Sequence, residues 1–474
     1  MNEINKPDPL KSGLEEHEFR RAGIILLINI ILFFVLLTTL PFEQNANKGL
    51  ALLTFIGILW LTEAIHVTIT ALLVPILAIA LGLVSTSAAL ASFANPTIFL
   101  FFGGFALATA LHIQGLDKII ANKIMNLAKG KLFLAVLYLF SVTAFLSMWM
   151  SNTATAAMML PLAMGILSKM DKKSGHNTYV FVLLGIAYSA SIGGMGTIVG
   201  SPPNAIVASQ LKISFAQWMM YGLPVMVLMM PLMIGSLYIT FKPKLNTTFE
   251  KTFEEKSLHQ KQYIALAIFI IIALCWVFSG QINPLLSSLF GLEKNMASFD
   301  SIVALIAAVA ICTTRVATWD DIQKNTDWGV LMLFGGGLTL SAVLRDSGAS
   351  KVLADMVVTV IEGKHIYLIG LVVAAFIIFL TEFTSNTASA ALLVPIFISI
   401  AETLDMPPLG LSLIIGLGAS CAFMLPVATP PNAIVFGTGQ IKQSEMIRAG
   451  IRLNILSVFL IGTIAYLLWY PSQY

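Results

Sequence analysis

Long apolar tracts separated by short polar stretches dominate this chain of 474 residues. Clear examples cover residues 22–40, 67–84, 218–241 and 453–470. Each falls within the roughly 17 to 25 residues that a helix needs to cross the hydrocarbon core of a bilayer. Because no water is available at that depth to pair backbone groups, helices are the expected elements. The pattern predicts an all-α polytopic membrane protein whose main partner is the lipid bilayer.

The composition agrees with this prediction and excludes several functional classes. Hydrophobic residues make up 57% of the chain and charged residues 11%, whereas a soluble domain carries about 25% charged residues. A net charge of +3 is too small to indicate a nucleic-acid partner. Cys275, Cys312 and Cys421 are scattered in or beside apolar tracts and suggest neither a disulfide framework nor a metal site. The sequence contains no HExxH or GxSxG motif, so we expect no enzyme.

Two polar motifs occur twice inside apolar tracts. The segment FLSMWMSNTATAAMMLP (145–161) aligns with FLTEFTSNTASAALLVP (379–395), and GSPPNAIV (200–207) aligns with ATPPNAIV (428–435). The motifs occur in the same order in both halves, which indicates an internal repeat. Serine, threonine and proline in a single membrane helix often only kink it. Four interruptions paired by a repeat favour a functional site instead.

The charge distribution indicates that the second repeat is inverted. LFFGGFAL (100–107) resembles LMLFGGGLTL (331–340), and a helix end is predicted after each, at Gly115 and Gly348. Eleven crossings and a cytoplasmic N-terminus place most lysine and arginine residues on the cytoplasmic side, as the positive-inside rule requires. This arrangement needs two re-entrant hairpins, which we expect near 133–167 and 366–400. Five crossings then separate the two glycine motifs, and inverted repeats of this kind are typical of secondary transporters.

The hairpin tips are candidate anion sites. A helix that begins just after Ser151-Asn152-Thr153 or Ser385-Asn386-Thr387 directs free N–H groups and the positive end of its dipole toward the tip. Carbonyl groups released at the helix ends, with asparagine side-chain oxygens, could hold a small cation. Glu382, beside the second tip, either tunes such a cation site or makes a structural hydrogen bond to a helix end. Glu63 is expected in a solvated turn.

The segment ASCAFMLPVATPPNAIV (419–435), together with the SNT motifs and GSPPNAIV, resembles the divalent anion/sodium symporter (DASS) family. The resemblance covers the chain from about residue 50 to the end and implies a homodimeric elevator-type transporter in the cell membrane. It implies a scaffold domain of residues 1–131 and 256–365. The transport domain would comprise 132–255 and 366–474.

The resemblance also implies specific ligand sets. The substrate-binding residues would be Ser151, Asn152, Thr153, Ser385, Asn386, Thr387, Thr429 and Pro430. One sodium site would use Ser147, Ser151, Asn152 and Gly200, and its repeat counterpart would use Thr381, Thr384, Asn386 and Ala428.

The expected function is secondary active transport of C4 or C5 dicarboxylates such as succinate, malate, fumarate or 2-oxoglutarate. The hairpins themselves contain no lysine or arginine, so a dianion would need bound cations or exchange for another dianion. Sodium-coupled symport is favoured, since both cation sets retain serine or threonine and asparagine. A sodium-independent dicarboxylate exchanger is the alternative, and a sulfate or tricarboxylate carrier is a more remote one.

Overall fold

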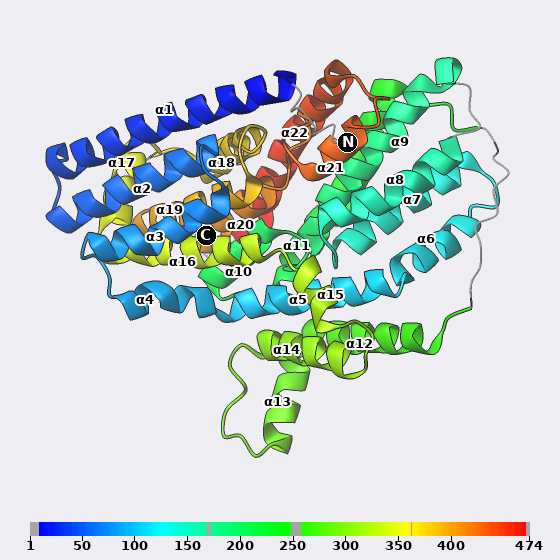
Figure 1. The fold of residues 1–474 in the computed structure, drawn as a ribbon, viewed down its shortest axis with the longest axis horizontal. Helices are drawn as coiled ribbons and strands as arrows, with labels where there is room; N and C mark the ends of the chain where they lie inside the picture. The colour runs from blue at the N-terminus through cyan, green and yellow to red at the C-terminus, as the bar shows by residue number, and fades with distance from the viewer. Residues whose placement is uncertain (1–8, 168–171, 247, 249–256, 362, 471–474) are drawn as a thin grey trace, which may run out of the picture.

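A computed structural model of the chain describes residues 9–167, 172–246, 248, 257–361 and 363–470. Residues 1–8, at the end of the chain that is predicted to be cytoplasmic, lie outside this part, as does the predicted domain boundary at 255/256. The described part is helical (Figure 1), which confirms the all-α class.

Eight helices of the described residues are long and apolar enough to cross a membrane. The sequence predicted eleven crossings, and short helices account for part of the difference. Helix α3 (Val67–Ala80) has 14 residues, α14 (Phe299–Thr313) has 15 and α20 (Pro408–Gly418) has 11, all fewer than the roughly 20 that a straight span requires.

The first half of the chain begins with α1, which packs on α2 (Figure 1). The apolar segment of α1 is otherwise mostly exposed. The elements of this half are α1 (Pro9–Thr39), α2 (Gln44–Thr62), α3, α4 (Thr86–Ala91), η1 (Ser92–Ala94), α5 (Pro96–Ile113), α6 (Leu116–Asn126), α7 (Leu132–Ser147), α8 (Asn152–Leu167), α9 (Lys172–Gly193), η2 (Gly194–Gly196), α10 (Pro202–Leu211) and α11 (Phe215–Phe241).

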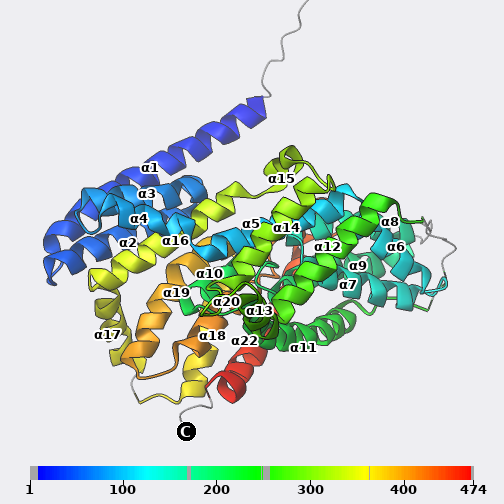
Figure 2. The same cartoon turned by 90° about the horizontal axis from the view of Figure 1, so that it is seen from below.

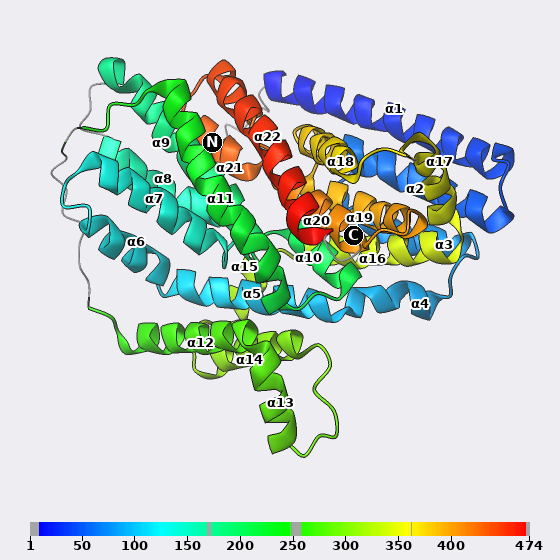
Figure 3. The ribbon, with the colours of Figure 1, turned by 180° about the vertical axis from the view of Figure 1, so that it is seen from behind.

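From α2 onward the second half follows the same order, with α13 added between the counterparts of α2 and α3, and none of its described helices corresponds to α1. Its elements are α12 (Gln260–Val277), α13 (Ser279–Leu289), α14, α15 (Trp319–Asn325), α16 (Trp328–Asp346), α17 (Ala349–Ile361), α18 (Ile366–Leu380), α19 (Asn386–Thr403), α20, α21 (Pro430–Phe436), α22 (Gln443–Ile464) and η3 (Ala465–Trp469). Helices α11 and α22, which end the two halves, lie side by side (Figure 3).

The two halves pack on each other reciprocally. Helix α5 packs on α14 (Figure 2), and its counterpart α16 packs on α3. Likewise α10 contacts α19, and α21 contacts α8. Contacts exchanged in this way between equivalent elements are those of two units related by a pseudo-two-fold axis, which supports the predicted repeat.

Glycines of the repeated FGG motifs make the close packing possible. A Cβ atom on Gly103 would lie 2.5 Å from the carbonyl oxygen of Ala304, and one on Gly336 would lie 2.5 Å from that of Ala71. Small residues allow membrane helices to approach at backbone distance. Gly115 and Gly348 follow these helices with φ of +64° and +80°, so the predicted helix ends are confirmed.

The two predicted hairpins are α7–α8 and α18–α19, which enter from opposite ends of the molecule (Figure 1). Ser151 Oγ accepts a hydrogen bond from Ala154 N at 3.2 Å, and Ser385 Oγ accepts one from Ala388 N at 3.4 Å. Serine at the N-cap satisfies one of the free N–H groups of a helix start. Helices α8 and α19 therefore begin at the SNT motifs, as the sequence predicted.

The PPN motifs follow two broken helices. Helix α9 stops before the loop that leads to α10, and α20 stops before the loop that leads to α21. Asn204 Nδ2 donates to the carbonyls of Gly194 (2.8 Å) and Thr197 (2.7 Å). Asn432 Nδ2 donates in the same way to Ala422 (3.1 Å) and Leu425 (3.0 Å). The asparagine of each motif thus pairs carbonyls that the break in the helix leaves free.

Candidate functional site

A cavity of about 1240 Å³ lies between the two hairpin tips. It is lined by every predicted substrate residue: Ser151, Asn152, Thr153, Ser385, Asn386, Thr387, Thr429 and Pro430. Gly200, Thr384 and Ala428 of the predicted cation sets also line it. Ser147 and Thr381 are fully buried behind the tips and do not line the cavity.

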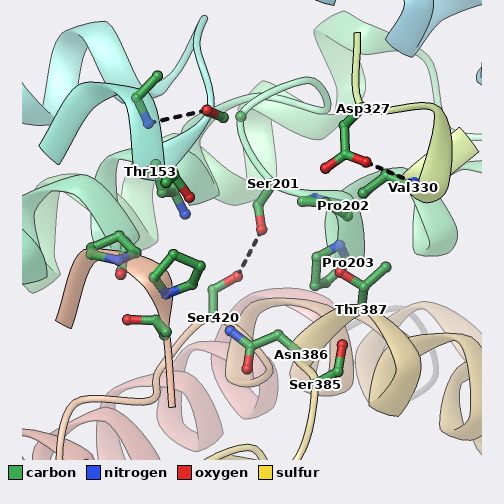
Figure 4. A pocket seen from close by; sticks show the side chains of 18 of the residues that line it. Thr153, Ser201, Pro202, Pro203, Asp327, Val330, Ser385, Asn386, Thr387 and Ser420 are labelled. Atoms are coloured by element: carbon green, nitrogen blue, oxygen red, sulfur yellow. Dashed lines mark hydrogen bonds between the residues drawn. The ribbon is translucent and has the colours of Figure 1, made fainter. Parts of the chain in front are cut away.

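Helix starts from both halves face this cavity. Figure 4 shows Thr153 of α8 on one side and Ser385, Asn386 and Thr387 on the other, with Ser201 between them. Free N–H groups and the positive ends of the α8 and α19 dipoles are therefore directed at one space. Two electropositive ends facing each other suit a ligand that carries a negative group at each end.

The first predicted cation set forms a cluster of oxygens. Ser147 Oγ lies 2.5 Å from Asn152 Oδ1 and 2.6 Å from the Ala190 carbonyl. A Cβ atom on Gly194 would lie 2.5 Å from Asn152 Oδ1 and 2.8 Å from the Gly200 carbonyl. The absence of a side chain at Gly194 thus leaves room where these oxygens converge. A hydroxyl, an amide oxygen and a carbonyl are suitable ligands for a hard cation.

The second set is arranged differently. Thr381 Oγ1 donates to the Ile378 carbonyl at 3.2 Å, and Thr384 Oγ1 donates to the Leu380 carbonyl at 3.0 Å and lies 2.8 Å from Ser389 Oγ. Asn386 Oδ1 is buried without a hydrogen-bond partner. Leaving a buried acceptor unpaired costs about 1–3 kcal/mol, and a bound cation would remove this cost. Asn386 Oδ1 is therefore available to bind a cation, whereas the hydrogen bonds of Thr381 and Thr384 go to Ile378, Leu380 and Ser389 and do not join them to it.

Three serines that line the cavity, Ser191, Ser201 and Ser420, were not predicted from the sequence. Ser201 Oγ and Ser420 Oγ lie 3.2 Å apart, and both residues are nearly fully buried (Figure 4). Ser201 directly precedes the two prolines of the repeated PPN motif, and this position was a signal from which the sequence could have predicted it. Ser420 has no serine at the equivalent position of the first half, so the repeat gives no signal for it.

The remaining wall comes from elements outside the hairpins. Phe101 and Phe105 of α5 and Val330 of α16 supply apolar surface. Arg21 of α1 and Lys324 of α15 bring positive charge to the cavity although the hairpins have none. Glu63 is exposed at the end of α2, as predicted for a solvated turn, and also lines the cavity.

A model of the sodium:sulfate symporter transmembrane region matches residues 17–473. The chain belongs to this family of divalent anion/sodium symporters. The resemblance inferred from the SNT and PPN motifs is therefore confirmed.

An uncharacterized transporter of Haemophilus influenzae is 72% identical to this DASS protein over 449 residues, which cover 95% of this chain and 97% of the relative. The sodium-dependent dicarboxylate transporter SdcS of Staphylococcus saprophyticus is 32% identical over 518 residues, covering 99% and 98%. The crystal structure of the YdaH transporter of Alcanivorax borkumensis has a TM-score of 0.57 and 12% identity, covering 80% and 86%. At that identity, the structural similarity supports the fold alone.

Proposed function

We propose that this DASS transporter is a sodium-coupled carrier of C4 or C5 dicarboxylates. The observation that carries the proposal is the cavity into which both SNT helix starts point. The two tips belong to equivalent positions of an inverted repeat, so the site has similar chemistry at its two ends. A dicarboxylate has the same symmetry, whereas sulfate has one anionic centre. The name of the 32% identical relative, a sodium-dependent dicarboxylate transporter, supports the same assignment.

Cation coupling follows from charge. The hairpins contain no lysine or arginine, and moving an uncompensated charge against the membrane potential costs about 2.3 kcal/mol per 100 mV. Cations held by the two oxygen sets would neutralise the dianion during its movement. The unpaired Asn386 Oδ1 and the cluster at Ser147, Asn152 and Gly200 support this role.

The carrier works by an elevator mechanism as a homodimer in the cell membrane, with a cytoplasmic N-terminus. Its scaffold comprises 1–131 and 256–365, and its transport domain comprises 132–255 and 366–474. The cavity opens on the side of Lys324, which the charge distribution assigns to the cytoplasm, so this conformation is inward-facing.

The two halves differ in ways that support alternating access. Val199 is 9% exposed and its equivalent Val427 is 84% exposed in the cavity. Val199 packs against Gly104 of the scaffold. The contact is so close that a Cβ atom on Gly104 would lie 2.8 Å from the valine side chain. In an inverted repeat, the opposite state is obtained by exchanging the environments of the two halves. Val427 is then covered and Val199 is exposed.

Uptake of radiolabelled succinate into proteoliposomes tests the proposal. Vesicles with and without internal succinate are compared in sodium and in choline, and unlabelled sulfate and citrate serve as competitors. We expect net uptake into empty vesicles driven by an inward sodium gradient, and loss of this uptake in the Asn386→Ala variant. Uptake only into preloaded vesicles, unchanged in choline, would establish exchange. Competition by sulfate or citrate that exceeds competition by unlabelled succinate would contradict the substrate class.

A further inference from the structure

Glu382 is a carboxylate buried in the turn between α18 and α19. Its side chain is fully inaccessible to solvent. It lies between Thr381 and Thr384, two residues of the second cation set. A buried ionisable group at membrane depth is expensive, so its partners decide what it does.

The partners of Glu382 are all donors. Oε1 accepts from the backbone N–H groups of Phe423 (2.7 Å) and Met424 (2.9 Å), and Oε2 accepts from Leu425 N (3.1 Å). Asn454 Nδ2 of α22 donates to Oε1 at 2.7 Å. Three successive amides that converge on one group form a concavity that binds an anion. These donors offset part of the cost of burying the carboxyl group, and the structural hydrogen bond considered in the sequence analysis is present.

The contacts of Glu382 fix the loop that connects α20 to α21. In this loop the backbone amides of residues 423–425 donate to Glu382. The carbonyls of Ala422 and Leu425 in the same loop accept from Asn432 Nδ2. Helix α22 lies directly against the loop, because a Cβ atom on Gly450 would collide with the Phe423 carbonyl. The same loop continues into Ala428 and Thr429, which line the cavity.

The equivalent loop of the first half is held by neutral groups. Met148 occupies the position of Glu382. Its carbonyl accepts from Thr197 Oγ1 at 2.5 Å, and Thr197 Oγ1 accepts from Gly200 N at 3.1 Å. The two cation sets therefore differ chemically, since only the second has an acidic side chain within its own turn.

We propose that Glu382 is a positioning residue for the second cation set. Its hydrogen bonds hold the loop that presents Ala428 and Thr429, and its charge raises the affinity of this set for a cation. The second set therefore binds sodium more tightly than the first. This inference rests on the proposed sodium-coupled function.

Sodium-dependent thermal stabilisation of the purified protein without substrate provides a readout that does not depend on transport. Melting is followed over a sodium titration at constant ionic strength, with potassium as the replacing ion. In Glu382→Gln we expect the half-saturating sodium concentration to rise at least tenfold. Succinate affinity at saturating sodium should stay within about threefold of wild type. The matched control, Asn454→Leu, removes a neutral donor and keeps the charge, so it should lower the melting temperature without shifting the sodium titration.

A second pair of variants tests the proposal even if Glu382→Gln does not fold. Thr384→Val impairs the second set and Ser147→Ala the first, and we expect only Thr384→Val to abolish the tighter sodium event. A wild-type titration in Glu382→Gln, or loss of the tighter event in Ser147→Ala alone, would overturn the inference while leaving sodium coupling intact. If sodium and potassium stabilise the wild type equally, the proposed coupling itself fails.

Discussion

Replacing Trp149 by alanine should release the first hairpin tip from the scaffold. Trp149 follows the end of α7, and its ring stacks on Phe215 with a centroid separation of 6.0 Å. It also meets Phe269 of α12 edge-on at 5.0 Å. Phe215 in turn stacks on Trp276 of α12 at 4.7 Å. These rings join the predicted transport domain to the predicted scaffold in the present conformation.

Phe383, the equivalent residue of the second tip, is not packed against aromatic rings in this way. Phe383 is 73% exposed and lines the open cavity. An aromatic pair contributes about 0.5–1.5 kcal/mol beyond its buried area. Only the Trp149–Phe269 pair crosses from the predicted transport domain to the predicted scaffold, because Phe215 lies in the transport domain with Trp149. Its loss removes about 0.5–1.5 kcal/mol from this conformation, which corresponds to a shift of roughly 2- to 13-fold toward the opposite state. Phe383→Ala, the matched control, removes none of these pairs and should not favour the opposite state.

Single cysteines at Val199 and Val427 measure the shift. They are introduced separately after Cys275, Cys312 and Cys421 have been replaced by serine, and a hydrophilic thiol reagent is added to the purified protein. In the otherwise unchanged protein, V427C should react quickly and V199C slowly, in line with their exposures of 84% and 9%.

The Trp149→Ala substitution should weaken this preference, so that V199C reacts faster and V427C more slowly than in the otherwise unchanged protein. The rates are obtained from the increase in mass per protomer. An equal increase at both positions would indicate loosening of the fold rather than a change of state. Unchanged rates at both positions would show that the aromatic contacts do not stabilise this conformation.

Gly103→Leu should prevent folding or lower the melting temperature strongly, because its side chain would enter the backbone of α14, whereas Gly235→Leu, with nothing within 4 Å, should behave like wild type. The yield of monodisperse protein measures the difference, and equal yields would contradict the packing argument. Asn152→Ala and Asn386→Ala should each weaken succinate binding at least tenfold in a calorimetric titration, since hydrogen bonds to charged groups contribute about 1.5–3 kcal/mol. Only Asn152→Ala should also lower the melting temperature of the ligand-free protein, because Asn152 Oδ1 has a partner and Asn386 Oδ1 has none.

The sequence predicted the features that depend on local chemistry. The helix starts after Ser151 and Ser385 follow from capping, and the breaks before the PPN motifs follow from the missing N–H groups of proline. Because these signals occur in both halves, they also predicted that the two tips meet at one site, since equivalent positions in an inverted repeat meet at its axis.

The supporting contacts could not be predicted in this way. Ser420 lies in a loop without a repeated serine, and its partner Ser201 is 219 positions away in the chain. The two roles considered for Glu382 could not be separated from the sequence, because its amide donors lie 41 to 43 residues away in a loop without regular structure. Such contacts depend on tertiary packing, and the hydrophobic periodicity of the sequence does not predict which distant residues come together.

The two halves differ partly because of the present conformation and partly because of their sequences. Comparing residues at equivalent positions separates these two causes. Val199 and Val427 are identical side chains in opposite environments, so their difference belongs to the conformation and should reverse when the carrier changes state. Met148 and Glu382 differ in the sequence itself, so the carboxyl group near the second tip is present in every state. A carrier built in this way can exchange the exposure of its two tips while keeping its cation sets unequal. One of these sets would then be filled before the other at low sodium, whichever side of the membrane the cavity faces.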